Sequence, residues 1–347
     1  MTICSAYRYR LTALTFAVYF RRKESILCGG CHTGSLSAMI KFYNSTENGV
    51  LTQCDTAVAG CWVSVINPTT DEVRELIEVY GLDSGFVKSS LDEEESSRIE
   101  REDDQTLVII DTPVSSVDED KTMNFYTQPI GIILTESYVF TISITETQIL
   151  NEAMNGNIRN LRTTFKTRFV LQLLLRIAAI FLFYLKQIDK LSSAAEQQLH
   201  DAMRNELLMQ LLALEKSLVY FSTSLKANEA TIEKIFRGRV IKLYDEDQDL
   251  LEDVLIEMKQ AIEMANIYTG ILSSMMDGFS SVISNNLNMV MWRLTIITVI
   301  LEIPNIIFSF YGINTVDLPI PYTFFPISLA VVLTTAVGIW LTKTRKK

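Results

Sequence analysis

Tyr311-Gly312-Ile313-Asn314 lies at the end of one long apolar run and shortly before a second one. The first run covers residues 291–311 (MWRLTIITVILEIPNIIFSFY), and the second covers residues 322–342 (YTFFPISLAVVLTTAVGIWLT). A helix needs roughly 20 consecutive apolar residues to cross a bilayer, so each run is long enough to do so. The sequence therefore predicts two transmembrane helices, joined by a loop at residues 312–321.

The composition limits what the chain can bind. Its formal net charge is -10, which argues against nucleic acid as a partner and favours a cationic ligand. The cysteines are odd in number and unevenly spaced, which argues against a disulfide framework and favours a reducing cytoplasm around the soluble part. They are Cys4, Cys28, Cys31, Cys54 and Cys61.

Residues 1–38 differ in composition from the rest of the chain. They are basic and hold a short apolar stretch that ends at Arg21-Arg22-Lys23. A secretory signal would carry its positive charge before the apolar stretch and a small-residue cleavage site after it. We therefore expect this segment to be a start-site extension, with the functional chain beginning at Met39.

Residues 39–150 predict a cytoplasmic domain of mixed α/β structure with a largely antiparallel sheet. A polar cap precedes a predicted helix from Val73 to Tyr80, which ends at Gly81. Short runs rich in β-branched and aromatic residues, separated by turn-like breaks, predict strands at 60–66, 107–111, 130–134 and 138–144.

Residues 151–290 predict a stalk of long helices. Residues 169–185 are apolar, but Gln172 and Arg176 interrupt them and an amphipathic pattern continues beyond, so we expect a buried soluble helix rather than a membrane span. Residues 186–236 and 245–290 predict two further long helices. No breaker separates the last of these from the first predicted span.

The charges at the membrane boundary predict the topology. The basic tail at residues 343–347 (KTRKK) places the C-terminus in the cytoplasm, and Arg293 marks the same side at the start of the first span. The loop at 312–321 is then external and both termini are cytoplasmic. We expect the protein to lie in the plasma membrane or the inner membrane of the cell.

Polar residues lie along one side of the first predicted span and of the helix that leads into it. At roughly 100° per residue they fall within about 120° of one another. Lipid cannot satisfy such groups, and two helices from one chain cannot surround water, so we expect several copies to meet along this side. A hairpin packed by polar contacts without conduction is the alternative. The residues of this polar stripe are Asp277, Ser284, Asn288, Met291, Thr295, Thr298, Glu302, Asn305 and Ser309.

Several motifs carry a family resemblance over residues 40–347. They are the Tyr-Gly-x-Asn motif at 311–314, Pro304 inside the first span, the segment 288–297 (NMVMWRLTII), the acidic segment 91–100 (LDEEESSRIE), the segment 174–177 (LLRI) and the basic tail. With these features the chain resembles the CorA family of divalent-metal channels and transporters.

The resemblance implies a homopentamer with a cytoplasmic α/β domain, a funnel of long helices and a pore lined by the first span. It implies transport of Mg²⁺, with Co²⁺ or Ni²⁺ in some members. Asn314 would stand at the external mouth and hold a hydrated cation, and Gly312 would permit close backbone packing and special dihedral angles. Asn288 would form a lower polar ring, Met291 and Leu294 an apolar constriction, and Asp277 a cytoplasmic acidic ring.

Two positions depart from the family pattern. The family's signature usually carries methionine where this chain has Ile313, and the zinc-transporting ZntB-like branch varies this position. The resemblance also implies an apolar side chain at the position of Glu302. Several carboxylates at one level of a pore repel one another. We therefore expect Glu302 to be a direct or water-mediated metal site, or a proton-linked site.

The resemblance further implies a regulatory metal site between cytoplasmic domains, which would hold the pore shut when it is occupied. Asp253 lies on the helix where such an acid is expected, and its partner would come from the acidic cluster that includes Asp92 and Glu93. A solvated acidic face is the alternative interpretation of these residues.

Nothing in the sequence indicates an enzyme. His32 and His200 are the only histidines, and no catalytic group can be assembled around them. We expect no cofactor beyond a transported or regulatory divalent cation, Mg²⁺ first. The leading hypothesis is a pentameric Mg²⁺ channel or transporter. A proton-linked transporter of Zn²⁺ or another transition metal, and a non-conducting membrane-anchored sensor or scaffold, remain the alternatives.

Overall fold

The computed structural model of the protein describes residues 39–46, 51–117, 123–201, 205–237, 244–312 and 324–344. Three sequence-based predictions concern segments outside these residues: the extension at 1–38, the part of the external loop that holds Ile313 and Asn314, and the end of the basic tail.

A seven-stranded sheet forms the centre of the N-terminal domain, in the order β2-β1-β3-β7-β6-β5-β4. Among the strands of the described residues only β3 and β7 pair in parallel, so the predicted mixed α/β domain with a largely antiparallel sheet is confirmed. The strands are β1 (Met39–Ser45), β2 (Leu51–Cys54), β3 (Trp62–Ile66), β4 (Arg98–Glu102), β5 (Gln105–Val117), β6 (Met123–Leu134) and β7 (Val139–Ser143).

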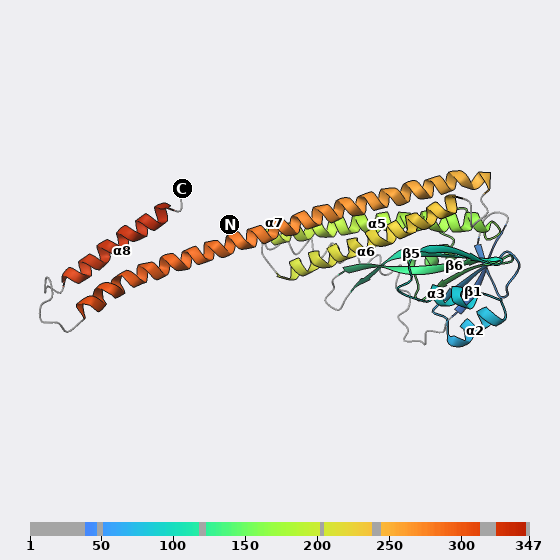
Figure 1. The fold of residues 1–347 in the computed structure, drawn as a ribbon, viewed down its shortest axis with the longest axis horizontal. Helices are drawn as coiled ribbons and strands as arrows, with labels where there is room; N and C mark the ends of the chain where they lie inside the picture. The colour runs from blue at the N-terminus through green and yellow to red at the C-terminus, as the bar shows by residue number, and fades with distance from the viewer. Residues whose placement is uncertain are drawn as a thin grey trace, which may run out of the picture.

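Two short helices cover one face of the sheet, α2 (Thr70–Glu78) and α3 (Ser84–Ser90) (Figure 1). Thr69 and Glu72 form a capping box at the start of α2, which satisfies two backbone donors that the helix leaves open. Helix α3 lies so close to β6 that a Cβ on Gly131 would stand 1.9 Å from Ser90 Oγ. Glycine at this position is therefore what allows the helix to reach the sheet.

Two long helices cover the other face, α5 (Lys166–Asp201) and α6 (Asn205–Phe236), and the first part of α7 (Asp245–Tyr311) packs on these two helices rather than on the sheet. The short helix α4 (Gln148–Met154) precedes them. Helix α5 is apolar enough to cross a membrane, but 67% of its apolar window is buried inside the protein. The predicted single helix over 186–236 is wrong. No glycine or proline interrupts the pattern near residue 185, so α5 continues to Asp201, and α6 is a separate helix that begins at Asn205 and packs beside α5.

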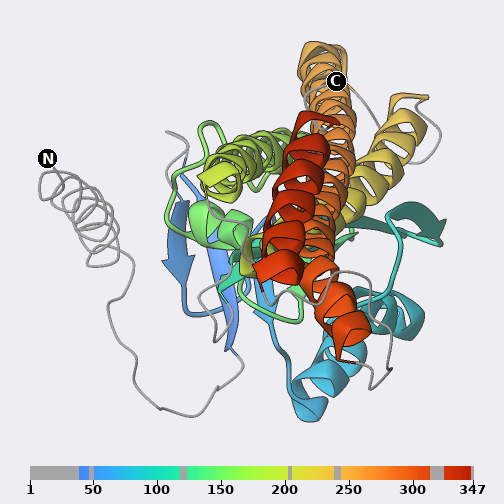
Figure 2. The same cartoon turned by 90° about the vertical axis from the view of Figure 1, so that its left-hand side faces the viewer.

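Helix α7 is a single helix of 67 residues that leaves the domain and continues through Tyr311, with Pro304 inside it. Helix α8 (Phe324–Thr344) returns beside its outer part, as Figures 1 and 2 both show. The prediction that the last stalk helix runs directly into the first apolar run is confirmed. With α5, the described residues contain three helices long and apolar enough to cross a membrane.

Candidate functional site

The polar stripe on α7 is uncovered in the chain. Every one of its members is exposed, from Asp277 in the stalk to Ser309 near the end of the helix, and Leu294 beside it is exposed as well. The sequence placed these residues on one side from helical periodicity alone. The continuous helix confirms that they share a side, because no break shifts the phase between residues 245 and 311.

Helix α8 packs on the opposite side of α7. The residues of α7 that are partly buried in the outer part include Ile296, Ile300, Ile303 and Ile307. These positions lie on average about 140° around the helix from the centre of the stripe. Helix α8 thus covers the apolar side of α7 and leaves its polar side open.

Hydrogen bonds orient several groups of the stripe. The hydroxyls of Thr295 and Thr298 donate to the carbonyls of Met291 and Leu294 at 2.9 Å, which leaves their lone pairs available outward. The Asn305 amide nitrogen lies 3.4 Å from Glu302 Oε1. The stripe therefore presents oxygen acceptors at successive turns of the helix, which are ligands that hard cations accept.

Gly312 ends α7, and its N–H donates to the carbonyls of Phe308 and Ser309 at 2.9 and 3.2 Å. Its backbone has φ -83° and ψ -6°, so the expectation of special dihedral angles is wrong. The close approach is real, because a Cβ would lie 3.2 Å from the Phe308 carbonyl oxygen. Asn314, two residues further on, is outside the described residues.

The acids expected to form the regulatory site are exposed, but within one chain they do not cluster together. Asp253 lies on the outer side of α7, and Asp92 and Glu93 lie between α3 and β4. Among the described residues, no three histidine, cysteine, aspartate or glutamate side chains lie close enough together to hold a metal ion. These three acids therefore do not form a metal cluster within a single chain.

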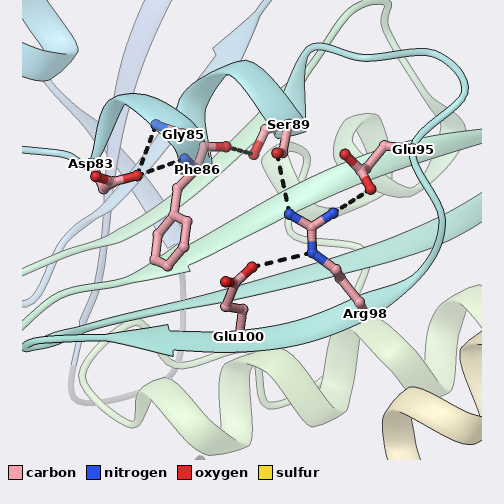
Figure 3. Close-up of polar contacts among 8 residues, drawn as sticks. Asp83, Gly85, Phe86, Ser89, Glu95, Arg98 and Glu100 are labelled. Atoms are coloured by element: carbon pink, nitrogen blue, oxygen red, sulfur yellow. Dashed lines mark hydrogen bonds and ion pairs between the residues drawn. The ribbon is translucent and has the colours of Figure 1, made fainter.

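Arg98 holds the end of the acidic segment, as Figure 3 shows. Its guanidinium pairs with Glu95, lies 3.3 Å from Glu100 Oε2, and donates to Ser89 Oγ at 3.2 Å. Glu95 is therefore already neutralised by its own chain. Asp92, Glu93 and Glu94 are exposed, and the Asp92 carboxylate accepts the backbone N–H of Glu94 at 3.0 Å.

A cavity of about 420 Å³ lies between the acidic segment and α6, and Asp111 lines it. This aspartate is 9% exposed. Burial raises the pKa of the Asp111 carboxyl, while hydrogen bonds from Ser224 and Ser97 act against that shift. Sequence patterns did not single out Asp111. The available signal was an acid at the end of the apolar run 107–110, where a strand buried on both faces has no place for a charge.

Asn228 connects this cavity wall to the helices. Its side chain is fully buried on α6, donates to the Asp111 carbonyl at 2.9 Å and accepts the Asp111 N–H at 3.0 Å. Strand β4 pairs with β5 only up to Ile109, so the amide replaces a missing strand at this point of the edge. The acidic segment and α6 are joined through this contact and through Ser97.

Known proteins share this architecture. The model of the CorA-like Mg²⁺ transporter protein family matches residues 59–344. The cobalt/magnesium transport protein CorA of Methanocaldococcus jannaschii is 28% identical over 268 residues, which are 75% of this chain and 81% of that protein.

Solved structures share the fold. The complete structure of the CorA magnesium transporter from Methanocaldococcus jannaschii matches with a TM-score of 0.73 and 23% identity, covering 90% of this chain and 99% of that one. The ZntB cytoplasmic domain from Vibrio parahaemolyticus matches with a TM-score of 0.56 and 13% identity, covering 72% of this chain and all of that domain, at 100%. Because the family model spans most of the sequence, the chain belongs to the family of CorA-like Mg²⁺ transporter proteins.

Proposed function

We propose that this protein transports divalent cations across a membrane, with Mg²⁺ as its main substrate, and that five copies surround one pore. The uncovered polar stripe on α7 is the observation that carries this proposal. Lipid cannot hydrogen-bond Glu302, Asn305 or the threonine hydroxyls, and α8 lies on the opposite side of the helix. Several copies that meet along the stripe would give these groups water and ions. The number five rests on the family resemblance.

In this proposal the outer part of α7 and the helix α8 are the two membrane spans. Helix α5 belongs to the cytoplasmic assembly, because its apolar side chains are already buried against the protein. Arg293 and Lys343 lie at the same end of the two spans, which supports cytoplasmic termini in a plasma or inner membrane.

The proposed ion path starts at a ring of Asn314 side chains, positioned by the close turn at Gly312. Amide carbonyls can hold a hydrated Mg²⁺ without removing its tightly bound water. Further in, the path passes the oxygen acceptors of the stripe. An apolar constriction at Met291 and Leu294 would close by excluding water, with Asn288 and Asp277 at the cytoplasmic approach.

Regulation would use pairs of neighbouring copies. Asp253 is exposed on the outer side of its stalk, and Asp92 and Glu93 are exposed on the side of the domain. A cation held between Asp253 of one copy and this acidic segment of the next would stabilise one arrangement of the stalks over another. Cytoplasmic Mg²⁺ would thereby favour the closed pore.

Flux measurements in liposomes test the proposal. Purified full-length protein is reconstituted, and the uptake of Mg²⁺, Co²⁺, Ni²⁺ and Zn²⁺ is followed with and without a pH gradient. We expect Mg²⁺ uptake without a pH gradient, together with Co²⁺ uptake, because a relative is named for these two cations. Asn314→Ala is expected to reduce Mg²⁺ uptake by roughly tenfold or more, since its ring would lose the oxygen that contacts the hydrated ion.

The other outcomes identify the alternatives. Zn²⁺ uptake that requires a proton gradient would replace the Mg²⁺ assignment with a ZntB-like transporter. No uptake of any cation by correctly assembled protein would leave a membrane-anchored sensor or scaffold. Subunit counting by native mass spectrometry is an independent check, because a monomer would leave the stripe facing lipid and would rule out a shared pore.

A further inference from the structure

Glu302 is an acid in the middle of an apolar helix segment, and the chain leaves it exposed. It lies eleven residues after Met291 and nine before Tyr311, the ends of the first span. Glu302 belongs to the polar stripe, which lies on the side of α7 that faces away from α8. An ionisable side chain at this depth is costly in lipid and is found where it faces water, an ion or a partner.

The chain supplies no positive charge to match Glu302. In the two spans and their described flanks the basic residues are Arg293 and Lys343, both at the cytoplasmic end. Arg293 is nine residues away, which is about 13 Å along the helix. None of the ion pairs found among the described residues includes Glu302. Helix α8 has no titratable group before Lys343.

Asn305 makes Glu302 part of a pair. Its amide nitrogen donates to Glu302 Oε1 at 3.4 Å, which leaves the second carboxylate oxygen and the Asn305 Oδ1 as acceptors on the same side of α7. One turn further in, the Thr298 hydroxyl gives its proton to the Leu294 carbonyl and keeps its lone pairs outward. The side chains on these two turns thus offer oxygen ligands, and none of the three carries a positive charge.

We propose that Glu302 and Asn305 from neighbouring copies form an inner binding tier for a divalent cation, below the external mouth. This inference rests on the proposed transport function. Carboxylate and amide oxygens are the ligands that Mg²⁺, Mn²⁺ and Ca²⁺ take. Several carboxylates at one level repel one another, and a bound divalent cation between them relieves the repulsion. The tier selects for charge by its carboxylates, whereas a ring of asparagine at the mouth selects for a hydrated ion.

The test compares full-length wild type with Glu302→Gln and Glu302→Asp, and uses Glu263→Gln as a matched control. Glu263 is an exposed acid on the same helix in the cytoplasmic stalk. Mg²⁺ uptake into liposomes gives the concentration for half-maximal flux. Binding of Mn²⁺ to the purified oligomer, counted by electron paramagnetic resonance, reports occupancy without any need for transport.

We expect Glu302→Gln to raise the Mg²⁺ concentration for half-maximal flux by about tenfold, and to remove one class of bound Mn²⁺. A tenfold change corresponds to the loss of a charge-assisted contact of roughly 1.4 kcal/mol. Glu302→Asp should keep the Mn²⁺ site with altered affinity, because the charge remains on a shorter side chain. Glu263→Gln should change neither measurement.

Unchanged half-saturation and unchanged Mn²⁺ binding in Glu302→Gln would overturn the inference while wild-type flux upholds transport. A loss of pH dependence alone, with cation binding intact, would also overturn it and assign Glu302 to protons. If wild type carries no cation, transport fails, and the Mn²⁺ count in wild type against Glu302→Gln still decides the site. If Glu302→Gln does not assemble, Asn305→Ala takes its place, because it removes the amide oxygen of the tier, and wild-type half-saturation and Mn²⁺ binding in that variant would count against the tier.

Discussion

The two halves of α7 are parts of one helix with different surroundings. The N-terminal half, before Met291, buries Leu251, Val254, Met258, Ala261 and Ala265 completely, and it packs against α5 and α6. The outer half, from Met291 to Tyr311, has no fully buried side chain among the described residues, although its sequence is the more apolar of the two. The N-terminal half is covered by its own chain, whereas most of the outer half is not.

This difference separates two sources of stability. In the soluble part, the hydrophobic effect and close packing within one chain fix the structure. In the outer part, apolar residues gain little from each other because lipid is equally apolar, and the polar stripe decides what has to meet. Substitutions in the two halves should therefore affect different measurements.

The largest expected contrast is between Leu251→Ala and Leu301→Ala. Leu251 is fully buried, and its truncation should lower the free energy of unfolding of the soluble part by about 2–5 kcal/mol. Leu301 is 67% exposed, and the same truncation should leave that free energy within roughly 0.5 kcal/mol. Urea unfolding of the full-length protein in detergent measures both. Equal losses would mean that the outer half contributes to the same core as the N-terminal half.

A second contrast concerns two glycines. An added Cβ at Gly131 would collide with Ser90, so Gly131→Ala should destabilise the domain by about 1–3 kcal/mol. At Gly338 in α8 the nearest atom is Ile300 Cδ1 at 3.9 Å, an ordinary contact, and alanine there should be neutral or stabilise the helix by up to about 1 kcal/mol.

Thermal unfolding checks both substitutions, and Ser90→Gly provides a rescue. The double variant Gly131→Ala, Ser90→Gly should recover part of the stability, since the colliding Cβ and Oγ are gone. A Gly131→Ala variant as stable as wild type would show that α3 can move away from β6 freely, and that the packing there is looser than the structure indicates.

The smallest expected effect concerns Glu152, an acid that has an ion-pair partner, in contrast to Glu302, which has none among the described residues. Arg176 hydrogen-bonds Glu152 and lowers the pKa of that carboxyl, with burial acting in the opposite direction. A carboxyl with a lowered pKa in the folded state stabilises the protein above its ordinary pKa, 4.5, and loses this contribution as the pH falls through its folded value.

Glu152→Gln should therefore cost on the order of 1 kcal/mol at pH 7, because Arg176 is partly exposed and water screens the pair. The difference between wild type and variant should shrink as the pH falls below 4.5, in urea unfolding at several pH values. A difference that stayed constant down to pH 3 would mean that the charge of Glu152 is not what stabilises the fold.

The sequence was sufficient where periodicity carries the information. Runs of β-branched and aromatic residues indicated β3, β7 and the central parts of β5 and β6, and the 3.6-residue period placed the stripe on one side of α7. The sequence did not reveal β1 and β2, which are partly exposed, or α3, whose sequence SGFVKSS has weak helix propensity. Helix α3 forms because Asp83 caps it and Phe86 and Val87 are buried beneath it, a tertiary effect.

Contacts between residues far apart in the sequence could not be predicted from local sequence patterns. Asn228 and Asp111 are 117 residues apart. Nothing in the sequence around either residue indicates that the Asn228 side-chain amide completes the hydrogen bonding of the sheet edge. The side of α7 that α8 covers was also not predictable, because the mean hydropathy of a span does not say which face meets its neighbour. The resemblance to a family supplied the expected mouth and regulatory acids, and these stay predictions.

The continuity of α7 has a mechanical consequence. At 1.5 Å per residue its 67 residues extend for about 100 Å as one rod. A tilt of roughly 5° at the end beside the sheet would displace the other end by about 9 Å if the rod does not bend. Pro304, which removes one backbone hydrogen bond near the far end, is the one proline along its length. In the proposed transporter, a small rotation of the sheet domain would thus displace the far end of α7 by a distance comparable to the width of a helix.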